Sequence, residues 1–358
     1  MPPKTRRLML RLGMALGVFA LGLELGLRLL PPYLPLWIAN DLVQAYSPRV
    51  GGMYFRDSQT QMYFCYPNDR RWCLFNGYRW LHETDARGNR NPEGTGSDVL
   101  LLGDSFIYGH CLEEADTLGA FLRRDYGWKV YNLARQGDSL TQQYIQFRLY
   151  FEELKPRKVL LFPFVNDFGD IAARKGERPD AKQELNIDVA ALRQRKENPK
   201  YWKVSGHWYD RFYTYRLLAL MERYLQRQKP AAPGGKVRGW ATALTDPQER
   251  EPLERYYEAL LVDLLLRCQQ GGAELSVVFI HTDTPADPWP QAQALMNEVL
   301  ERLCSRHQIP YASAESLLKG HPEYSLPNDG HLTRQGHEAL ARFVVEHTKK
   351  REKKSGAL

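Results

Sequence analysis

The residues of this chain that are suited to chemistry are a serine in its first third and an aspartate–histidine pair near its other end. Ser105 lies in Gly-Asp-Ser-Phe at 103–106, directly after a short apolar run. A serine hydroxyl is a weak nucleophile and needs a positioned base. Asp329 and His331 are two residues apart in a loop that leads into a helix, so the carboxylate can hold one imidazole nitrogen and leave the other to take the serine proton. Each segment alone is equally typical of a turn or a helix cap.

The elements that must position these residues alternate between strand and helix from residue 98 onward. Continuous apolar strands alternating with helices predict a parallel sheet covered on both faces. Ligands of such sheets bind at the carboxyl ends of the strands, and Ser105 directly follows the first strand. Strands are predicted at 98–103, 129–133, 158–164, 275–280 and 309–312, and helices at 117–124, 140–154, 254–269, 290–306 and 334–347.

The N-terminus has the pattern of a membrane-targeting segment. A basic leader precedes the uninterrupted apolar stretch 12–23, and Pro31-Pro32 ends the helix. Extended to 8–30 the stretch reaches spanning length but includes Arg11, Glu24 and Arg28. We favour an uncleaved signal anchor over a cleaved signal peptide followed by secretion. The positive-inside rule then places the leader in the cytoplasm and the catalytic domain outside it, in the periplasm or the extracellular space.

The net charge of +7 does not indicate a nucleic-acid-binding protein. The excess of basic residues is confined to 1–30 and 349–358, each with five basic residues and one acidic residue. The rest of the chain is therefore close to neutral, without the basic footprint that nucleic-acid binding requires.

Four segments resemble, in the same order, the motif blocks of the SGNH/GDSL hydrolase family. The resemblance covers about residues 98 to 346, apart from most of an insertion at about 168–250. The amino-acid sequence around the first two blocks, and the stretch 82–93 before them, resemble the membrane-anchored bacterial branch of this family. The residues that match are, block by block, Asp104 with Ser105, Gly137, Asn166 with Asp167, and Asp329 with His331.

The resemblance implies a three-layer α/β/α sandwich with a flavodoxin-like parallel sheet, and a role for each matching residue. Ser105 attacks an acyl carbonyl, His331 is general base and then general acid, and Asp329 orients His331. The oxyanion is held by the backbone N–H groups of Ser105 and Gly137 and by the Asn166 amide.

Asp104 and Asp167 support the first and third motifs, and the family needs neither metal nor organic cofactor. Phe164 departs from the pattern, because the family usually has a glycine two residues before the asparagine.

Outside the motifs, the expected organisation is an anchor at 1–30, a lead-in at 31–95, a hydrolase domain at 96–348 and a disordered basic tail at 349–358. An insertion at about 168–250 is expected as a lid, a partner surface or a solvated excursion. Cys65 and Cys73 are close in sequence, and a disulfide and free thiols are both open for them.

The leading functional hypothesis is hydrolysis of an O-acyl ester of a cell-envelope lipid or glycan, through an acyl-enzyme on Ser105. One alternative is O-acyl transfer from the same acyl-enzyme. The other is a catalytically weak envelope scaffold that binds a partner through the insertion.

Overall fold

The computed structural model describes residues 3–43, 46, 49–176, 179–227, 242–282 and 289–355. At its centre is a five-stranded parallel sheet with the order β10-β9-β7-β5-β6. This sheet confirms the predicted fold class. β5 lies between β7 and β6, and all four of its residues are buried. The strands are β5 (Val99–Leu102), β6 (Val130–Asn132), β7 (Lys158–Leu161), β9 (Glu274–Phe279) and β10 (Tyr311–Ser313).

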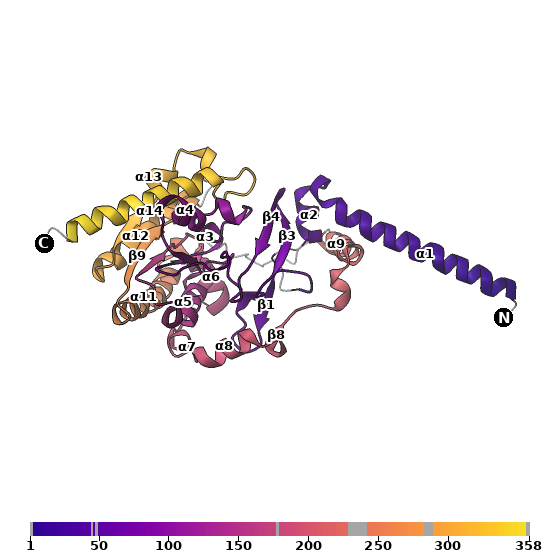
Figure 1. Ribbon diagram of the computed structural model, residues 1–358, viewed down its shortest axis with the longest axis horizontal. Coiled ribbons are helices and arrows are strands. Elements are labelled where there is room, and N and C mark those ends of the chain that lie inside the picture. The colour runs from indigo at the N-terminus through magenta and orange to yellow at the C-terminus, as the bar shows by residue number, and fades with distance from the viewer. Residues whose placement is uncertain are drawn as a thin grey trace.

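Helices cover both faces of the sheet and complete three layers (Figure 1). One pair packs as α4 against α14, and another as α5 against α11. Ser139 is the N-cap residue of α5 and forms a capping box with Gln142, and Thr117 is the N-cap residue of α4, where its hydroxyl accepts from the Ala120 N–H. The long helices are α4 (Leu118–Tyr126), α5 (Leu140–Leu154), α11 (Pro247–Gln270), α12 (Trp289–Arg306) and α14 (Arg334–Ser355).

The last helix is longer than the sequence predicts. α14 continues to Ser355, so the expectation of a disordered tail from residue 349 is wrong as far as this residue. Arg351 reaches back to the Glu274 carboxylate at the start of β9, at 2.5 Å. Basic side chains at a helix C-terminus also interact favourably with the helix dipole. Both effects extend the helix through a segment whose composition alone is typical of disorder.

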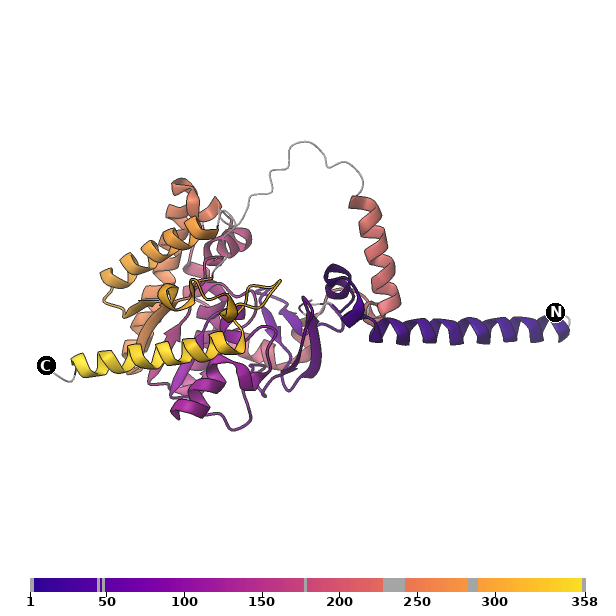
Figure 2. The same cartoon turned by 90° about the horizontal axis from the view of Figure 1, so that it is seen from above.

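The N-terminal segment is one long helix that projects away from the domain (Figures 1 and 2). α1 (Pro3–Leu29) is long and apolar enough to cross a membrane over Thr5–Leu29, with few of its side chains buried. It is followed by η1 (Pro31–Tyr33) and α2 (Leu36–Val43).

The lead-in contains more regular structure than its composition suggests. It forms β1 (Tyr54–Asp57), β2 (Tyr63–Cys65), β3 (Arg70–Phe75) and β4 (Tyr78–Glu83). β3 and β4 form a hairpin whose two-residue turn is Asn76-Gly77, both with positive φ (48° and 87°). Asn-Gly is the sequence that such a turn favours, because both positions need left-handed backbone. The turn presents Asn76 toward the rest of the domain, as described below.

Cys65 and Cys73 are free thiols, not a disulfide. Cys65 lies on β2 and Cys73 on β3, and these strands belong to separate small sheets. Burial raises the pKa of each thiol to about 12, so both are protonated at neutral pH.

The insertion folds back against the lead-in. Its short strand β8 (Trp202–Lys203) pairs with β1, and Arg195 of α8 donates to the buried Asp57 carboxylate at 2.9 Å. Residues 228–241 lie outside the described residues. The remaining elements within the described residues are α3 (Ser105–Tyr108), η2 (Glu114–Asp116), α6 (Asp167–Lys175), α7 (Lys182–Leu185), α8 (Val189–Glu197), η3 (Pro199–Tyr201), η4 (Trp208–Arg211), α9 (Tyr213–Arg227), α10 (Thr242–Thr245), α13 (Glu315–Leu318) and η5 (Pro322–Tyr324).

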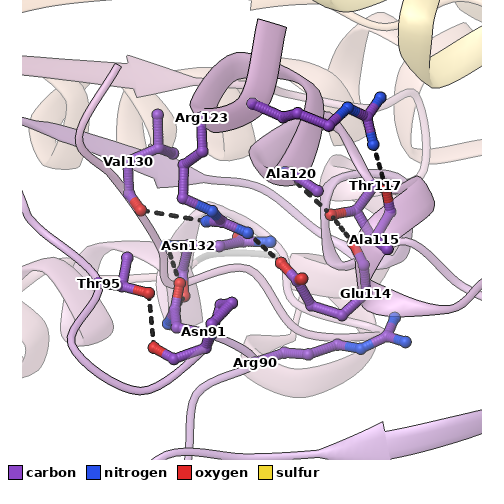
Figure 3. A network of polar contacts seen from close by, with 12 residues as sticks. Arg90, Asn91, Thr95, Glu114, Ala115, Thr117, Ala120, Arg123, Val130 and Asn132 are labelled. Atoms are coloured by element: carbon purple, nitrogen blue, oxygen red, sulfur yellow. Dashed lines mark hydrogen bonds and ion pairs between the residues drawn. The ribbon is translucent and has the colours of Figure 1, made fainter. Parts of the chain in front are cut away.

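The end of the lead-in is hydrogen-bonded to the edge of the central sheet (Figure 3). The Asn91 side chain accepts from the Asn132 N–H at 2.8 Å and donates to the Asn132 carbonyl at 3.0 Å, as a neighbouring strand would. The Asn132 side chain in turn donates to the Ile107 carbonyl of α3 at 2.8 Å. These bonds fix the loop after β6 relative to the helix that begins with Ser105.

Two carboxyl groups are buried at the carboxyl ends of β5 and β7. Asp104 caps α3, and its Oδ1 accepts from the Phe106 N–H at 2.9 Å. Asp167 begins α6 and is fully buried. Burial raises the pKa of Asp104 to about 8 and that of Asp167 well above its usual range, and the negative charge of Asp170 adds to both shifts.

The raised pKa of Asp104 predicts a pH dependence of stability. Between about pH 4 and pH 8 the unfolded chain loses the Asp104 proton while the folded chain keeps it, so the free energy of unfolding falls as pH rises. Asp104→Asn keeps an acceptor for the Phe106 N–H and removes the titration. We expect this variant to lose less stability than the wild type between pH 5 and pH 8, measured by thermal unfolding of the full chain in detergent. Asp180→Asn, at an aspartate with a 67% exposed side chain, is the control. Equal losses in wild type and Asp104→Asn would contradict the assignment.

Candidate active site

Ser105 is the first residue of α3, immediately beyond the carboxyl end of β5. A Cβ on Gly103 would lie 2.6 Å from the Ile107 Cγ1, so only glycine permits this close approach of α3 to the strand. The Asp104 cap then sets the start of the helix. The local sequence thus places the Ser105 hydroxyl at the edge of the sheet where parallel strands present ligands.

The structure brings Ser105, His331 and Asp329 together, although the serine and histidine are 226 residues apart. The Ser105 Oγ is 2.7 Å from the His331 Nε2, and the His331 Nδ1 is 2.5 Å from the Asp329 Oδ1. Positive φ angles at Asn328 (62°) and Gly330 (87°) bend the loop that carries Asp329 and His331. Within this loop the Asp329 carboxylate contacts the His331 ring, and the ring contacts the serine. In the tautomer that satisfies both bonds, Nδ1 donates to the carboxylate and Nε2 accepts from the hydroxyl.

Two further donors meet the second oxygen of Asp329. The Asn76 amide donates to Oδ2 at 2.9 Å, and the His110 Nε2 lies 3.4 Å from it. The Asp329 side chain is only 1% exposed. Burial alone would raise its pKa, but the hydrogen bonds from His110 and His331 hold the pKa far below its usual value. Asp329 is therefore ionised across the physiological range.

His110 and Asn76 are held by groups from the lead-in. The Tyr46 hydroxyl is 2.7 Å from the His110 Nδ1, so the neutral ring accepts there and donates from Nε2. Burial lowers the pKa of His110, which favours this neutral form. Asn40 on α2 exchanges two hydrogen bonds with Asn76, at 2.8 and 2.9 Å.

Asn76 lies outside the motifs that indicated site residues in the sequence. The Asn-Gly pair between two aromatic-rich segments is a hairpin signal that predicts the turn, although not its contact with Asp329.

Gly137 and Asn166 lie after β6 and β7, the two strands that flank β5. Gly137 has a φ of 68°, and its carbonyl accepts from Arg174 at 2.8 Å. Asn166 precedes α6, and its Nδ2 donates to the Asp170 carboxylate at 2.8 Å. A primary amide has two hydrogens, so this bond orients the group and leaves the second hydrogen for another acceptor. Burial raises the pKa of Asp170 to about 6.

Phe164, which replaces the usual glycine of the third motif, belongs to an aromatic wall beside the histidine. Its ring centroid is 4.3 Å from that of Phe106, which in turn lies 4.6 Å from that of His331. Trp289 extends the wall, with its centroid 5.9 Å from that of Phe164. The bulky residue therefore packs against the motif without displacing the Ser105–His331 contact.

A cavity of about 340 Å³ opens beside Gly137. Its wall combines tyrosines with basic side chains, and it includes Tyr46, the partner of His110. The cavity thus adjoins both the Gly137 loop and the hydrogen-bond network behind Asp329. It is lined by Tyr46, Tyr54, Tyr63, Arg135, Gln136, Gly137, Asp138 and Arg174.

His110, Asp329 and His331 also have ligand atoms within 4.8 Å of one another, a grouping that could hold a metal ion. The His331 Nε2, however, is already hydrogen-bonded to the Ser105 hydroxyl, and Nδ1 is used by Asp329. The arrangement fits proton transfer from the serine, since a metal on these atoms would replace the bonds that align the three side chains.

Solved structures of esterases and acylhydrolases are similar to this chain at low identity. TesA is 12% identical with a TM-score of 0.42, over 70% of this chain and 98% of its own. The esterase EstA from Pseudoalteromonas sp. is 11% identical with a TM-score of 0.41, over 70% and 96%. The lipase/acylhydrolase from Enterococcus faecalis is 16% identical with a TM-score of 0.39, over 71% and 96%. No curated protein matches the chain.

The family itself is shown by a match to a family model. The model of the GDSL-like lipase/acylhydrolase family matches residues 101–339, more than half of the chain. This range contains Ser105, Gly137, Asn166, Asp329 and His331, whose geometry is described above. The chain therefore belongs to the GDSL-like lipase/acylhydrolase family.

Proposed function

We propose that this protein is a serine esterase that removes an O-acyl group from a cell-envelope lipid or glycan through an acyl-enzyme on Ser105. The observation that carries the proposal is the hydrogen-bonded series from the Ser105 hydroxyl through His331 to the buried Asp329. In a family of acylhydrolases, this series provides the nucleophile, the base and the group that orients the base.

In the proposed first step the Ser105 Oγ attacks the acyl carbonyl while the His331 Nε2 takes its proton. Asp329 stabilises the imidazolium that forms and keeps its ring in place. Negative charge develops on the carbonyl oxygen, where the backbone N–H groups of Ser105 and Gly137 and the Asn166 amide are proposed to bind it. Removing one such donor typically raises the barrier by about 3 kcal/mol.

Collapse of the tetrahedral intermediate releases the alcohol, which takes the proton from His331, and leaves the acyl group on Ser105. Water then attacks in the esterase reaction, with His331 again as base. If a sugar hydroxyl enters instead, the same acyl-enzyme gives O-acyl transfer. The difference between the two lies in the acceptor that reaches the acyl-enzyme.

The class of substrate is proposed from the position of the domain. α1 is suited to cross a membrane, and the basic leader favours a catalytic domain on the extracytoplasmic side. Secretion after cleavage is the alternative. Acylated lipids and glycans are the esters available to a domain tethered there, and the cavity beside Gly137 offers tyrosine faces of the kind that contact sugars and acyl chains.

A panel of acyl esters tests this function. Full-length protein in detergent is incubated with aryl esters of increasing chain length and with O-acetylated envelope glycans, and both released acid and transferred acyl groups are measured. We expect turnover that falls by about ten thousandfold or more in Ser105→Ala. Ser139→Ala, at the buried N-cap serine of α5, is the control for loss of a hydroxyl. Turnover that persists in folded Ser105→Ala would contradict the proposal.

A second prediction concerns the Asn76 amide. Hydrogen bonds to charged groups contribute about 1.5–3 kcal/mol, so Asn76→Ala is expected to reduce kcat roughly tenfold by loosening Asp329. Asn68→Ala is the matched control, because Asn68 is also an asparagine with positive φ (52°) in a turn of the lead-in and is exposed. Equal kcat values for the wild type and Asn76→Ala would show that Asp329 needs no donor from the lead-in.

A further inference from the structure

We propose that α9 and α2 together form a membrane-docking surface, which lies at the head-group level of the bilayer entered by α1. The surface is defined by the exposed apolar side chains of α9 and those of α2 and the preceding turn. The proposal rests on α1 crossing the membrane and is independent of the reaction that the domain catalyses.

Hydrogen bonds attach the start of α9 to α1. Glu24, within the apolar helix, accepts hydrogen bonds from the Tyr213 and Thr214 N–H groups, both at 3.0 Å. These are the first two amides of α9, so the Glu24 carboxylate caps that helix from outside. Arg28 donates to Glu24 at 2.9 Å and to the Arg211 carbonyl at 3.1 Å. The start of α9 is thereby fixed at the level of Glu24.

The position of Glu24 along α1 sets the depth of this contact in the bilayer. From Thr5 to Glu24 the helix has twenty residues, which at about 1.5 Å per residue span roughly the 30 Å hydrocarbon core of a bilayer. The side chains of Arg6, Arg7 and Arg11, in the first turns of this span, can extend back to the inner head groups, and Glu24 then lies at the outer boundary. α9 begins beside the C-terminal end of α1 and runs away from it in a transverse direction, as Figure 2 shows from above and Figure 1 shows with α9 seen nearly end-on. A helix that runs transverse to a spanning helix at this depth lies in the plane of the interface.

The exposed face of α9 is apolar. Leu218 (64% exposed), Met221 (54%) and Leu225 (64%) recur at three- and four-residue spacing, and so share one side of the helix. The side that packs on the protein includes Arg216 and Leu220, both buried. A helix with its apolar stripe turned outward is the arrangement of interfacial helices, and in water it would be an exposed hydrophobic patch.

α2 continues the same surface. Trp37, 54% exposed, stacks on Tyr224 with ring centroids 6.3 Å apart. Arg223 pairs with Asp41 at 3.3 Å, which holds the two helices together from their polar sides. Tyr33, just before α2, is 85% exposed. Tryptophan and tyrosine are the side chains that bilayer interfaces favour, because each has an apolar ring and a polar tip.

Depth-dependent quenching tests the surface in the full chain. Because the five native cysteines are buried, thiol-reactive labels attach selectively to Leu218→Cys or Leu225→Cys. Each variant carries an environment-sensitive fluorophore and is placed by α1 in nanodiscs of phosphatidylcholine and phosphatidylglycerol, with and without shallow doxyl-labelled lipid. Leu266→Cys is the matched control, since Leu266 is an exposed leucine (47%) on α11 of the hydrolase domain.

We expect labels at 218 and 225 to emit at shorter wavelength than the label at 266 and to lose emission when doxyl lipid is added. Labels at 218 and 225 that resemble the control would overturn the proposal, because α9 would then face water. A blue shift without quenching by doxyl lipid would also overturn it, and would assign the surface to a protein such as a second copy of this chain. Neither outcome depends on esterase activity, so failure here is distinct from failure of the proposed reaction.

Discussion

The buried carboxylate of Asp329 is the constraint on which the site depends. A charge with almost no access to water is stable only when its oxygens are hydrogen-bonded, and Asp329 receives donors from three separate segments. His331 comes from the same loop, His110 from the turn after α3, and Asn76 from the hairpin of the lead-in. Removing any one leaves part of a buried charge unsatisfied. The hydrolase domain and the segment before it must therefore fold together for the His331 ring to be aligned with Ser105.

Much of the fold followed from local patterns. Continuous apolar runs that end in turn residues correctly predicted the five parallel strands, and with them the edge where Ser105, Gly137 and Asn166 lie. The Ser105–His331 contact was expected because the segments occur in the family's order. Asn76 was not expected, because its role arises from packing of a distant hairpin and leaves no periodic signal. The prediction of disorder was wrong over 349–355, because composition does not record that Arg351 pairs with Glu274 at the start of β9.

The lead-in connects the anchor to the chemistry through a short series of contacts. α2 follows α1 after one turn, Asn40 of α2 holds Asn76, and Asn76 holds Asp329. The insertion is attached to both segments, since α9 contacts α1 and Arg195 pairs with the buried Asp57 of the lead-in. Segments that sequence composition describes as a lead-in and an excursion thus form the contacts that fix the domain relative to α1.

We propose above that Ser105 is a nucleophile activated by His331 and Asp329. The most direct test is to treat the folded, full-length protein with a fluorophosphonate and to locate the adduct by peptide mass spectrometry. We expect one adduct, on the peptide that carries Ser105, absent in Ser105→Ala and formed far more slowly in His331→Ala. An adduct on another residue, or none on folded wild-type protein, would contradict it.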